Sequence, residues 1–136
     1  MLPENLAYAL TQVVHNFGAA ILVGGTVFWL WPVPRQEYAR PFAWIILGAW
    51  GAQILSGILF GATSFYYYGE APDLSIVALG ALVLKLCAAA AGFLLAAWQL
   101  ARGRDWGWGW VARAFQAQAA LAGLALTGAA FLRWFS

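Results

Sequence analysis

Charged side chains are scarce in this chain. Of its 136 residues, seven are Lys or Arg and five are Asp or Glu, which together make 9%, whereas 64% are hydrophobic. An ordinary soluble domain is about 25% charged. The sequence therefore has too few polar residues to cover a globule in water, which excludes a soluble domain, a disordered chain and a nucleic-acid-binding protein.

Cysteine, methionine and histidine occur once each, as Cys87, Met1 and His15. A single cysteine excludes an intramolecular disulfide, and the lack of thiols and thioethers leaves a copper pathway without its soft ligands. One histidine cannot give a heme two histidine ligands unless two subunits contribute one each. No Ser-His-acid arrangement is indicated either, so we predict no catalytic residue, and the sequence points away from an enzyme.

Long apolar runs fill almost all of the sequence. A helix needs roughly 20 apolar residues to cross a bilayer core of about 30 Å, and such runs occur at 6–31, 41–66, 74–100 and 110–134. The connections at 32–40, 67–73 and 101–109 are too short to form a domain. The sequence therefore predicts an all-α polytopic membrane protein, with residues 1–136 forming one domain of four transmembrane helices in an antiparallel bundle.

Arginine placement predicts the orientation of these helices. The first and third connections carry Arg35, Arg40, Arg102 and Arg104, and Arg113 lies at the same end, whereas only Arg133 lies at the other. Because basic residues stay on the cytoplasmic side, we expect a multi-pass protein of a bacterial-type inner membrane with both termini outside. The first residues carry Glu4 and no Lys or Arg, so we expect the first helix to remain in the mature protein. Tryptophans are expected to form an interfacial belt at the arginine-bearing boundary: Trp29, Trp31, Trp106, Trp108 and Trp110.

Small residues at four-residue steps predict where helices approach closely. Gly57 with Gly61 and Ala119 with Gly123 show this spacing, and so do Gly48, Ala52 and Ser56. We expect these stripes to pack inside the bundle. Contact with another subunit is the alternative.

Two ionisable residues lie deep within the apolar runs, His15 and Lys85. An ionisable side chain costs about 2.5–3.5 kcal/mol at the centre of a membrane helix and is a functional-site hypothesis by default. Counted from the expected outer ends of their helices at 1.5 Å per residue, both lie roughly 13–17 Å deep. We therefore predict that they face one site, with Gln12 one turn above His15 and Gln53 reaching in from the second helix.

Three interpretations of His15 follow: a hydrogen-bonded structural residue between helices, a ligand of a tetrapyrrole or metal, and a residue that handles protons. A neutral imidazole can bind iron when its second nitrogen has a partner, so heme is the candidate cofactor and His15 the candidate metal ligand. Lys85 is expected to pack or to face a ligand, where it would pair with a propionate or another anionic group. The predicted cofactor-binding residues are His15, Lys85, Gln12 and Gln53.

Four residues carry a resemblance to known families: His15, the Gly24-Gly25 pair that follows it, and Lys85 after an apolar run. In this the chain resembles the copper resistance protein D family and the four-helix bacterial protoporphyrinogen oxidase-like membrane proteins. The resemblance covers three of the expected helices. It implies a four-helix membrane fold with heme or metal associated through His15.

Three functions are consistent with these features. The first is a non-catalytic accessory or structural subunit of a membrane electron-transfer complex, because the chain is small and has minimal loops. The second is a heme- or metal-binding membrane redox protein with His15 as axial ligand. The third is transport of copper or a small solute. The expected partners are the lipid bilayer and either other membrane subunits or further copies of the chain, with no nucleic acid.

Overall fold

A computed structural model describes residues 3–31, 36–69 and 73–135. These ranges are helical almost throughout, with no strand among them. The elements are α1 (Pro3–Ala20), η1 (Ile21–Gly25), α2 (Thr26–Leu30), η2 (Gln36–Tyr38), α3 (Ala39–Tyr68), α4 (Ile76–Arg102), η3 (Gly103–Asp105) and α5 (Trp108–Phe135).

Within the described ranges, four helical stretches are long and apolar enough to cross a membrane, at Pro3–Leu30, Gln36–Tyr68, Ile76–Asp105 and Trp108–Phe135. The all-α fold class predicted from the sequence is therefore confirmed, and the chain is a helical membrane protein. Most ends of these stretches lie two to five residues beyond the predicted runs. The reason is that polar residues at the end of an apolar run continue the helix into the interface.

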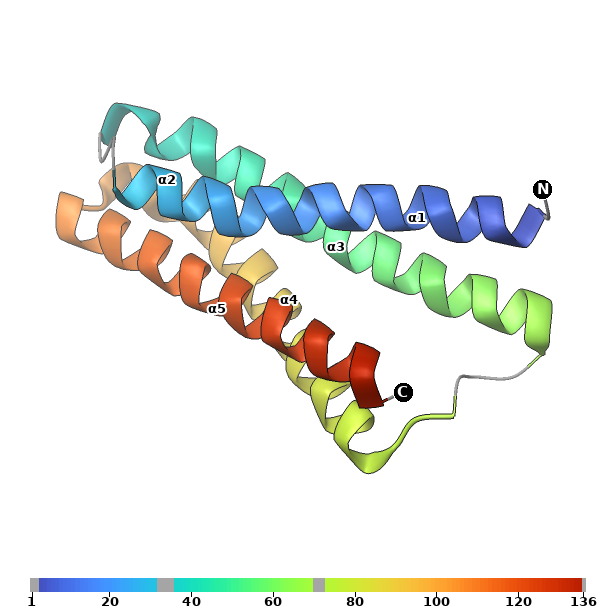
Figure 1. Cartoon of the computed structure of the whole chain (residues 1–136). Coiled ribbons are helices and arrows are strands. Elements are labelled where there is room, and N and C mark those ends of the chain that lie inside the picture. Colours follow the sequence, from blue (N-terminus) through green and yellow to red (C-terminus); the bar gives the residue numbers. More distant parts are fainter. Residues whose placement is uncertain (1–2, 32–35, 70–72, 136) are drawn as a thin grey trace.

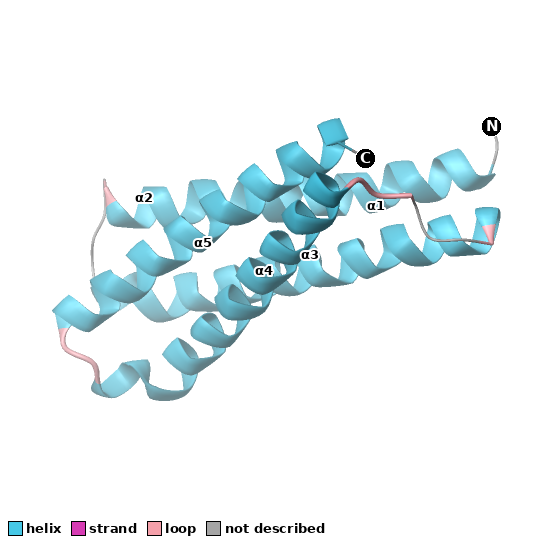
Figure 2. Cartoon of the chain, turned by 90° about the horizontal axis from the view of Figure 1, so that it is seen from below, coloured by secondary structure: helices cyan, strands magenta, loops and turns pink. Residues whose placement is uncertain are grey.

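The stretches run antiparallel, so one end of the bundle carries both basic connections (Figures 1 and 2). We call this the arginine end; Arg40, Arg102 and Arg104 lie there. The other end, where α1 and α4 begin and α3 and α5 finish, is called the open end. Two hydrogen bonds join elements there, from the Tyr68 hydroxyl to the Glu4 carboxylate and from Ser75 Oγ to the Phe135 carbonyl. Arg35 and Glu70, which belong to the predicted loops, lie outside the described residues.

The first span is not the uniform α-helix that its sequence predicts. Its residues Ile21–Gly25 form a π-helical segment, η1, between α1 and α2. The Thr26 hydroxyl donates to the Leu22 carbonyl at 2.6 Å and also lies 3.2 Å from the Val23 carbonyl. These contacts satisfy backbone acceptors that the wider turn displaces.

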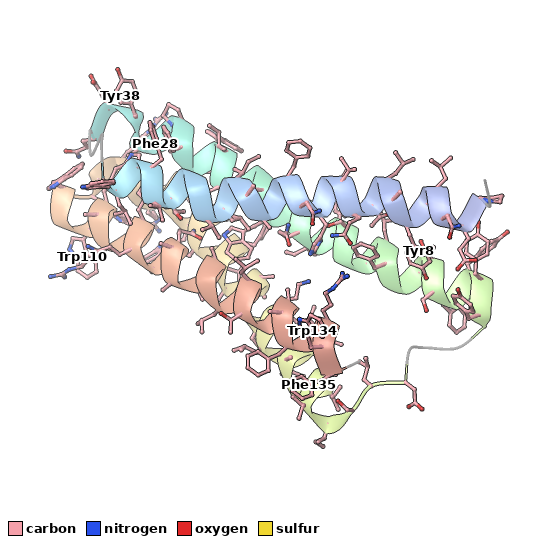
Figure 3. The ribbon with its side chains drawn as sticks, viewed as in Figure 1. Tyr8, Phe28, Tyr38, Trp110, Trp134 and Phe135 are labelled. Carbon is pink, nitrogen blue, oxygen red and sulfur yellow. The ribbon has the colours of Figure 1, made fainter. Side chains whose placement is uncertain are left out.

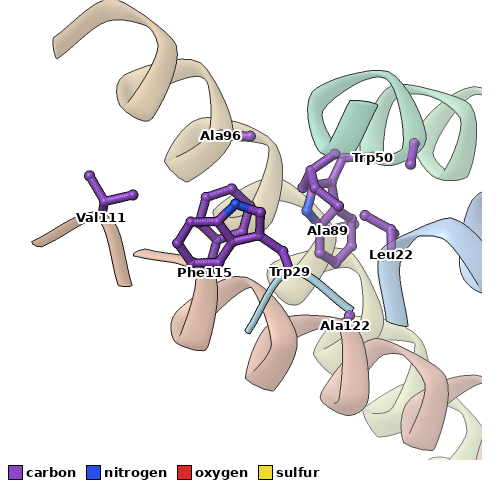
Figure 4. Close-up of a cluster of buried hydrophobic side chains, with 10 residues drawn as sticks. Leu22, Trp29, Trp50, Ala89, Ala96, Val111, Phe115 and Ala122 are labelled. Atoms are coloured by element: carbon purple, nitrogen blue, oxygen red, sulfur yellow. The ribbon is translucent and has the colours of Figure 1, made fainter. Parts of the chain in front are cut away.

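The core lies in the half of the bundle toward the arginine end, and Figure 4 shows its side chains gathered between the helices. Trp29 stacks on Phe115 with ring centroids 3.9 Å apart, and both are at most 1% exposed. Nearby, Trp50 Nε1 donates to Gln118 Oε1 at 2.7 Å, and Gln118 Nε2 donates to the Gly92 carbonyl at 3.1 Å. This chain of bonds ties α3, α5 and α4 together, and each polar group has a partner.

Gly92 makes that arrangement possible. A Cβ atom built on it would lie 2.2 Å from the Trp50 ring. Only a residue without a side chain therefore lets α4 come this close to the indole.

Two expectations about packing are wrong. Trp29 does not belong to an interfacial belt, because it is buried in the core, although Trp31 and Trp110 are exposed as expected. The glycines of the predicted small-residue stripes also face outward, although Ala52 and Ser56 of the same stripes pack inside the bundle as expected. No atom outside the local helix lies within 4 Å of a Cβ built on Gly48, Gly57, Gly61 or Gly123. The close approaches occur instead at Gly18, Gly92 and Gly128.

Candidate functional site

Toward the open end the bundle separates into two helix pairs. In the described residues α1 packs along α3 and α4 packs along α5, whereas α1 and α5 diverge beyond η1 (Figures 1 and 2). Figure 3 shows Tyr8 on α1 and Trp134 at the end of α5, on the two helices that separate. A cleft of about 420 Å³ lies between these helices.

The cleft has a polar part and an apolar part. Its polar lining consists of Gln12, His15, Asn16, Gln53, Lys85 and Arg133. The rest is aliphatic apart from Phe60 and comes largely from four alanines and one leucine of α5. A volume of this size falls within the range of about 300–1,000 Å³ that small-molecule sites occupy.

His15 is 9% exposed and contacts α3 through one ring nitrogen. Its Nδ1 lies 2.7 Å from the Ser56 hydroxyl oxygen. That hydroxyl lies 2.5 Å from the Ala52 carbonyl one turn back along α3, where it donates its only hydrogen. Since Ser56 Oγ is then an acceptor toward His15, Nδ1 carries the imidazole hydrogen.

The other ring nitrogen of His15 contacts α4. Nε2 lies 3.1 Å from Lys85 Nζ. Because the hydrogen of the neutral ring is on Nδ1, Nε2 is an acceptor and the lysine amine donates to it. His15 thus connects Ser56 to Lys85 and joins the two helix pairs at this depth.

Glutamine side chains complete the polar part from both sides of His15. Gln53 on α3 donates to the His15 carbonyl, and Gly18 permits this approach, because a Cβ atom there would lie 2.8 Å from Gln53 Nε2. On α1, Gln12 Nε2 donates to Asn16 Oδ1 at 2.6 Å. Phe60 packs its ring against the imidazole at a centroid distance of 5.6 Å and an angle of 77°. The imidazole is therefore held in one orientation by contacts from α3 and α4.

The cleft carries positive charge without a matching negative group. Lys85 and Arg133 both line it, and none of the described lining residues is acidic. The polar partner of the Lys85 amine is the imidazole. A charged ammonium in an apolar setting is costly unless an anion compensates it.

This donor set does not suit an iron atom as it stands. The His15 nitrogen that could bind a metal faces the lysine amine, and a donor hydrogen between the two nitrogens occupies the lone pair that a metal would need. The described residues also contain no group of three His, Cys, Asp or Glu side chains able to hold a metal ion. Axial ligation by His15 therefore stays a prediction, and it requires Lys85 to release Nε2.

The structure brings together all of the residues predicted to form a site. His15, Lys85, Gln12 and Gln53 line the same cleft, while their role in binding a cofactor stays a prediction. Sequence reasoning missed the parts played by Ser56, Phe60 and Arg133. Ser56 lies three residues beyond Gln53, a spacing that places both on neighbouring positions of one helix face. This spacing is the sequence feature that could have identified Ser56 as part of the site.

No protein-family model, curated protein or solved structure matches this chain. The resemblance to the copper resistance protein D and protoporphyrinogen oxidase-like families therefore stays a prediction.

Proposed function

We propose that this chain is a non-catalytic integral membrane protein that binds an amphipathic anion, with the anionic group at Lys85 and the apolar body along α5. One observation carries the proposal. Two cations and several amides line a cleft whose remaining surface is apolar, and no described lining residue is acidic.

Each part of the cleft has a separate task in this proposal. Lys85 donates one hydrogen to His15 and keeps further donors for a carboxylate or phosphate. The bond from His15 to Ser56 fixes the ring that holds Lys85 in place. The alanines of α5 leave room for the apolar body, which would enter from the bilayer between the diverging helices.

A fatty acid and a tetrapyrrole with propionates both have the required combination of a carboxylate and an apolar body. The proposed heme-binding role belongs to the second source. Here the cleft supports recognition of the propionates more than ligation of iron, because the lysine and arginine are available to carboxylates while Nε2 of His15 is occupied.

The first experiment measures binding to the purified protein in lipid nanodiscs. A fluorescent polyunsaturated fatty acid is expected to bind more tightly than its uncharged methyl ester. Lys85→Met should weaken binding of the acid by about tenfold or more, which corresponds to one lost charge-assisted hydrogen bond, and should leave the ester unchanged. Arg113→Met removes a cation at the other end of the bundle and serves as the matched control. Equal binding of acid and ester by the wild-type protein would overturn the proposal.

Porphyrins separate the two sources of the anion. Hemin and metal-free protoporphyrin carry the same propionates, but only hemin can use an axial ligand. Recognition of the carboxylates predicts equal affinity for hemin and for metal-free protoporphyrin. It also predicts that Lys85→Met lowers this affinity and that His15→Asn does not. Tighter binding of hemin, with a Soret band that His15→Asn shifts, supports a redox role with axial ligation. If neither porphyrin binds while the fatty acid does, the ligand is a lipid.

A second candidate function is an accessory subunit of a membrane electron-transfer complex. The supporting observation is that Gly57 and Gly61 on α3 face outward into open space, where small residues allow another membrane helix to approach. Gly57→Leu with Gly61→Leu should release co-purifying subunits or further copies of the chain in mild detergent, whereas the same change at Gly80 should not. Transport of copper or a small solute receives no support from the described residues.

For its setting we propose a bacterial-type inner membrane with both termini outside. The support is that the described arginines of the connections gather at one end of the bundle, as expected for a cytoplasmic face. Labelling of cysteines placed singly in the two ends of the chain by a membrane-impermeant reagent in intact cells tests this.

A further inference from the structure

A second, smaller pocket lies at the arginine end, separate from the cleft of His15 and Lys85. Its volume is about 190 Å³, and it is lined by residues of η2, the start of α3, the end of α4, η3 and the first turn of α5. Most small-molecule sites occupy about 300–1,000 Å³. The pocket therefore suits a small polar group rather than a whole metabolite.

Hydrogen-bond donors gather in this pocket. Arg40 and Arg104 line it together with Gln36 and Gln99. Arg40 uses Nη1 to bind the Leu100 carbonyl at the end of α4, at 3.0 Å. A guanidinium carries five donors in a planar fork, so most of those on Arg40 remain available, and the carbonyl that would repel an anion is already paired.

Gln99 is the observation that points to a ligand. The residue lines the pocket and is only 6% exposed. Among the described residues, no hydrogen bond is found for its side-chain amide, which therefore remains available to a group in the pocket. In the core half of the same bundle, Gln118 satisfies its amide at both ends. A group that enters the pocket would give Gln99 the partner that it lacks.

The charge of the pocket defines the class of that group. No described residue that lines the pocket carries a carboxylate, although Glu37 and Asp105 are neighbours in sequence of lining residues. Two guanidinium groups with an amide donor form a set that recognises phosphate through paired hydrogen bonds.

We propose that this pocket binds a phosphate group, and that in the membrane the group is the headgroup phosphate of an anionic phospholipid. The pocket lies where membrane helices begin and end, beside Trp108 and Trp110, which are exposed there as interfacial anchors are. Basic pockets between helices at this level are suited to anionic headgroups. The lipid would hold α3, α4 and α5 together at the end of the bundle opposite the cleft.

The test uses the full chain in detergent and compares variants of matched charge. Native mass spectrometry after incubation with phosphatidylglycerol or with phosphatidylcholine should show one retained phosphatidylglycerol. Arg104→Gln should lower its affinity by about tenfold, as one charged hydrogen bond requires, and Gln99→Leu should also lower it. Arg102→Gln removes a positive charge from the same end of the bundle but outside the pocket. The affinity of this variant for phosphatidylglycerol should therefore differ from that of the wild-type protein by less than about twofold.

The outcomes separate the proposal from its alternatives. Arg104 is exposed, so Arg104→Gln is expected to fold, and the circular dichroism of each variant checks this. Equal loss of lipid in Arg104→Gln and Arg102→Gln would overturn the pocket, because the attraction would then be a property of the whole basic end. If inorganic phosphate displaces the lipid, and does so through Arg104, the pocket binds phosphate from either source. None of these measurements depends on Lys85, so failure here leaves the proposed function intact.

Discussion

Two groups of polar residues in this bundle are arranged in opposite ways. Toward the arginine end, Trp50, Gln118 and Gly92 form a buried chain in which each polar group is paired. Toward the open end, Lys85 and Arg133 line a cleft in which no described residue supplies a negative charge. Polar side chains of similar kind therefore hold helices together in the first group, whereas in the second they remain available to a ligand.

This difference gives a way to tell a structural polar residue from a binding one in an apolar chain. Removing a fully paired group leaves its partners buried and unsatisfied, which destabilises the fold. Removing an uncompensated charge from a cleft eliminates the unfavourable free energy of holding that charge in an apolar setting, which stabilises the fold. A substitution that lowers the free energy of unfolding therefore identifies a structural polar residue, and one that raises it identifies a binding residue.

The largest effect is expected for Gly92→Ala. The added methyl group would lie 2.2 Å from the Trp50 ring, so α4 has to move away. We expect the free energy of unfolding in mixed micelles to fall by about 2–3 kcal/mol, the upper range for overpacking. Gly57→Ala is the matched control, because its added atom meets open space. A small and equal effect of the two changes would show that the tight packing at Trp50 does not hold the helices together in the half of the bundle toward the arginine end.

Gln118→Leu is expected to come second. It keeps the volume roughly constant but leaves Trp50 Nε1 and the Gly92 carbonyl without their partner. Unfolding in mixed micelles should become easier by about 1–2 kcal/mol, as expected for buried groups left unpaired. Thr127→Val, which removes an exposed hydroxyl bonded only within its own helix, should have little effect. An equally neutral Gln118→Leu would contradict the view that this half is held by its polar bonds.

Lys85→Met tests the other half and should have the opposite sign. It removes a charge that costs about 2.5–3.5 kcal/mol at a helix centre and loses one hydrogen bond to His15, a kind of contact that averages about 0.6 kcal/mol in membrane helices. Because the Lys85 side chain is only partly buried, the cost that its removal relieves is smaller than at a helix centre, and we expect a net stabilisation of about 1 kcal/mol, measured as above. Lys85→Arg keeps the charge and should show no gain. A clear loss of stability in Lys85→Met would place Lys85 among the structural residues and break the comparison.

The smallest effect is expected for Tyr68→Phe at the open end. It deletes the hydrogen bond from the Tyr68 hydroxyl to Glu4, which joins the exposed ends of α3 and α1. Exposed contacts of this kind contribute little, so the loss of stability should be about 0.5 kcal/mol or less. Thermal unfolding in detergent, compared with Tyr66→Phe, measures it. A larger loss of stability would show that contacts between the ends of α1 and α3 contribute as much to stability as contacts in the core.

Much of the fold could be predicted because run length alone determines spans in a membrane. The shared depth of His15 and Lys85 could also be predicted, because rise per residue is fixed and both helices begin at the same end. The roles of Ser56 and Arg133 could not. They depend on how α3 and α5 are rotated, and α3 is apolar on nearly every side, so its periodicity indicates no face.

The packing of glycines also escaped prediction, for a related reason. Four-residue spacing is a property of one helix. Whether two helices approach closely at a glycine also depends on which side chain the neighbouring helix places opposite it. Gly92 is essential because Trp50 faces it, while Gly57 and Gly61, with the better spacing, face nothing in the chain. The identity of the partner side chain therefore decides which glycine matters.

The π-helical turn at Ile21–Gly25 has a consequence for comparing this chain with others. A turn of this kind accommodates one extra residue within an otherwise regular helix, here between His15 and Trp29. Removing one residue from it would restore an ordinary helix without shortening any loop. When homologous sequences are aligned, a gap of a single position inside this transmembrane segment should thus be accepted as genuine, rather than being shifted into the connection that follows.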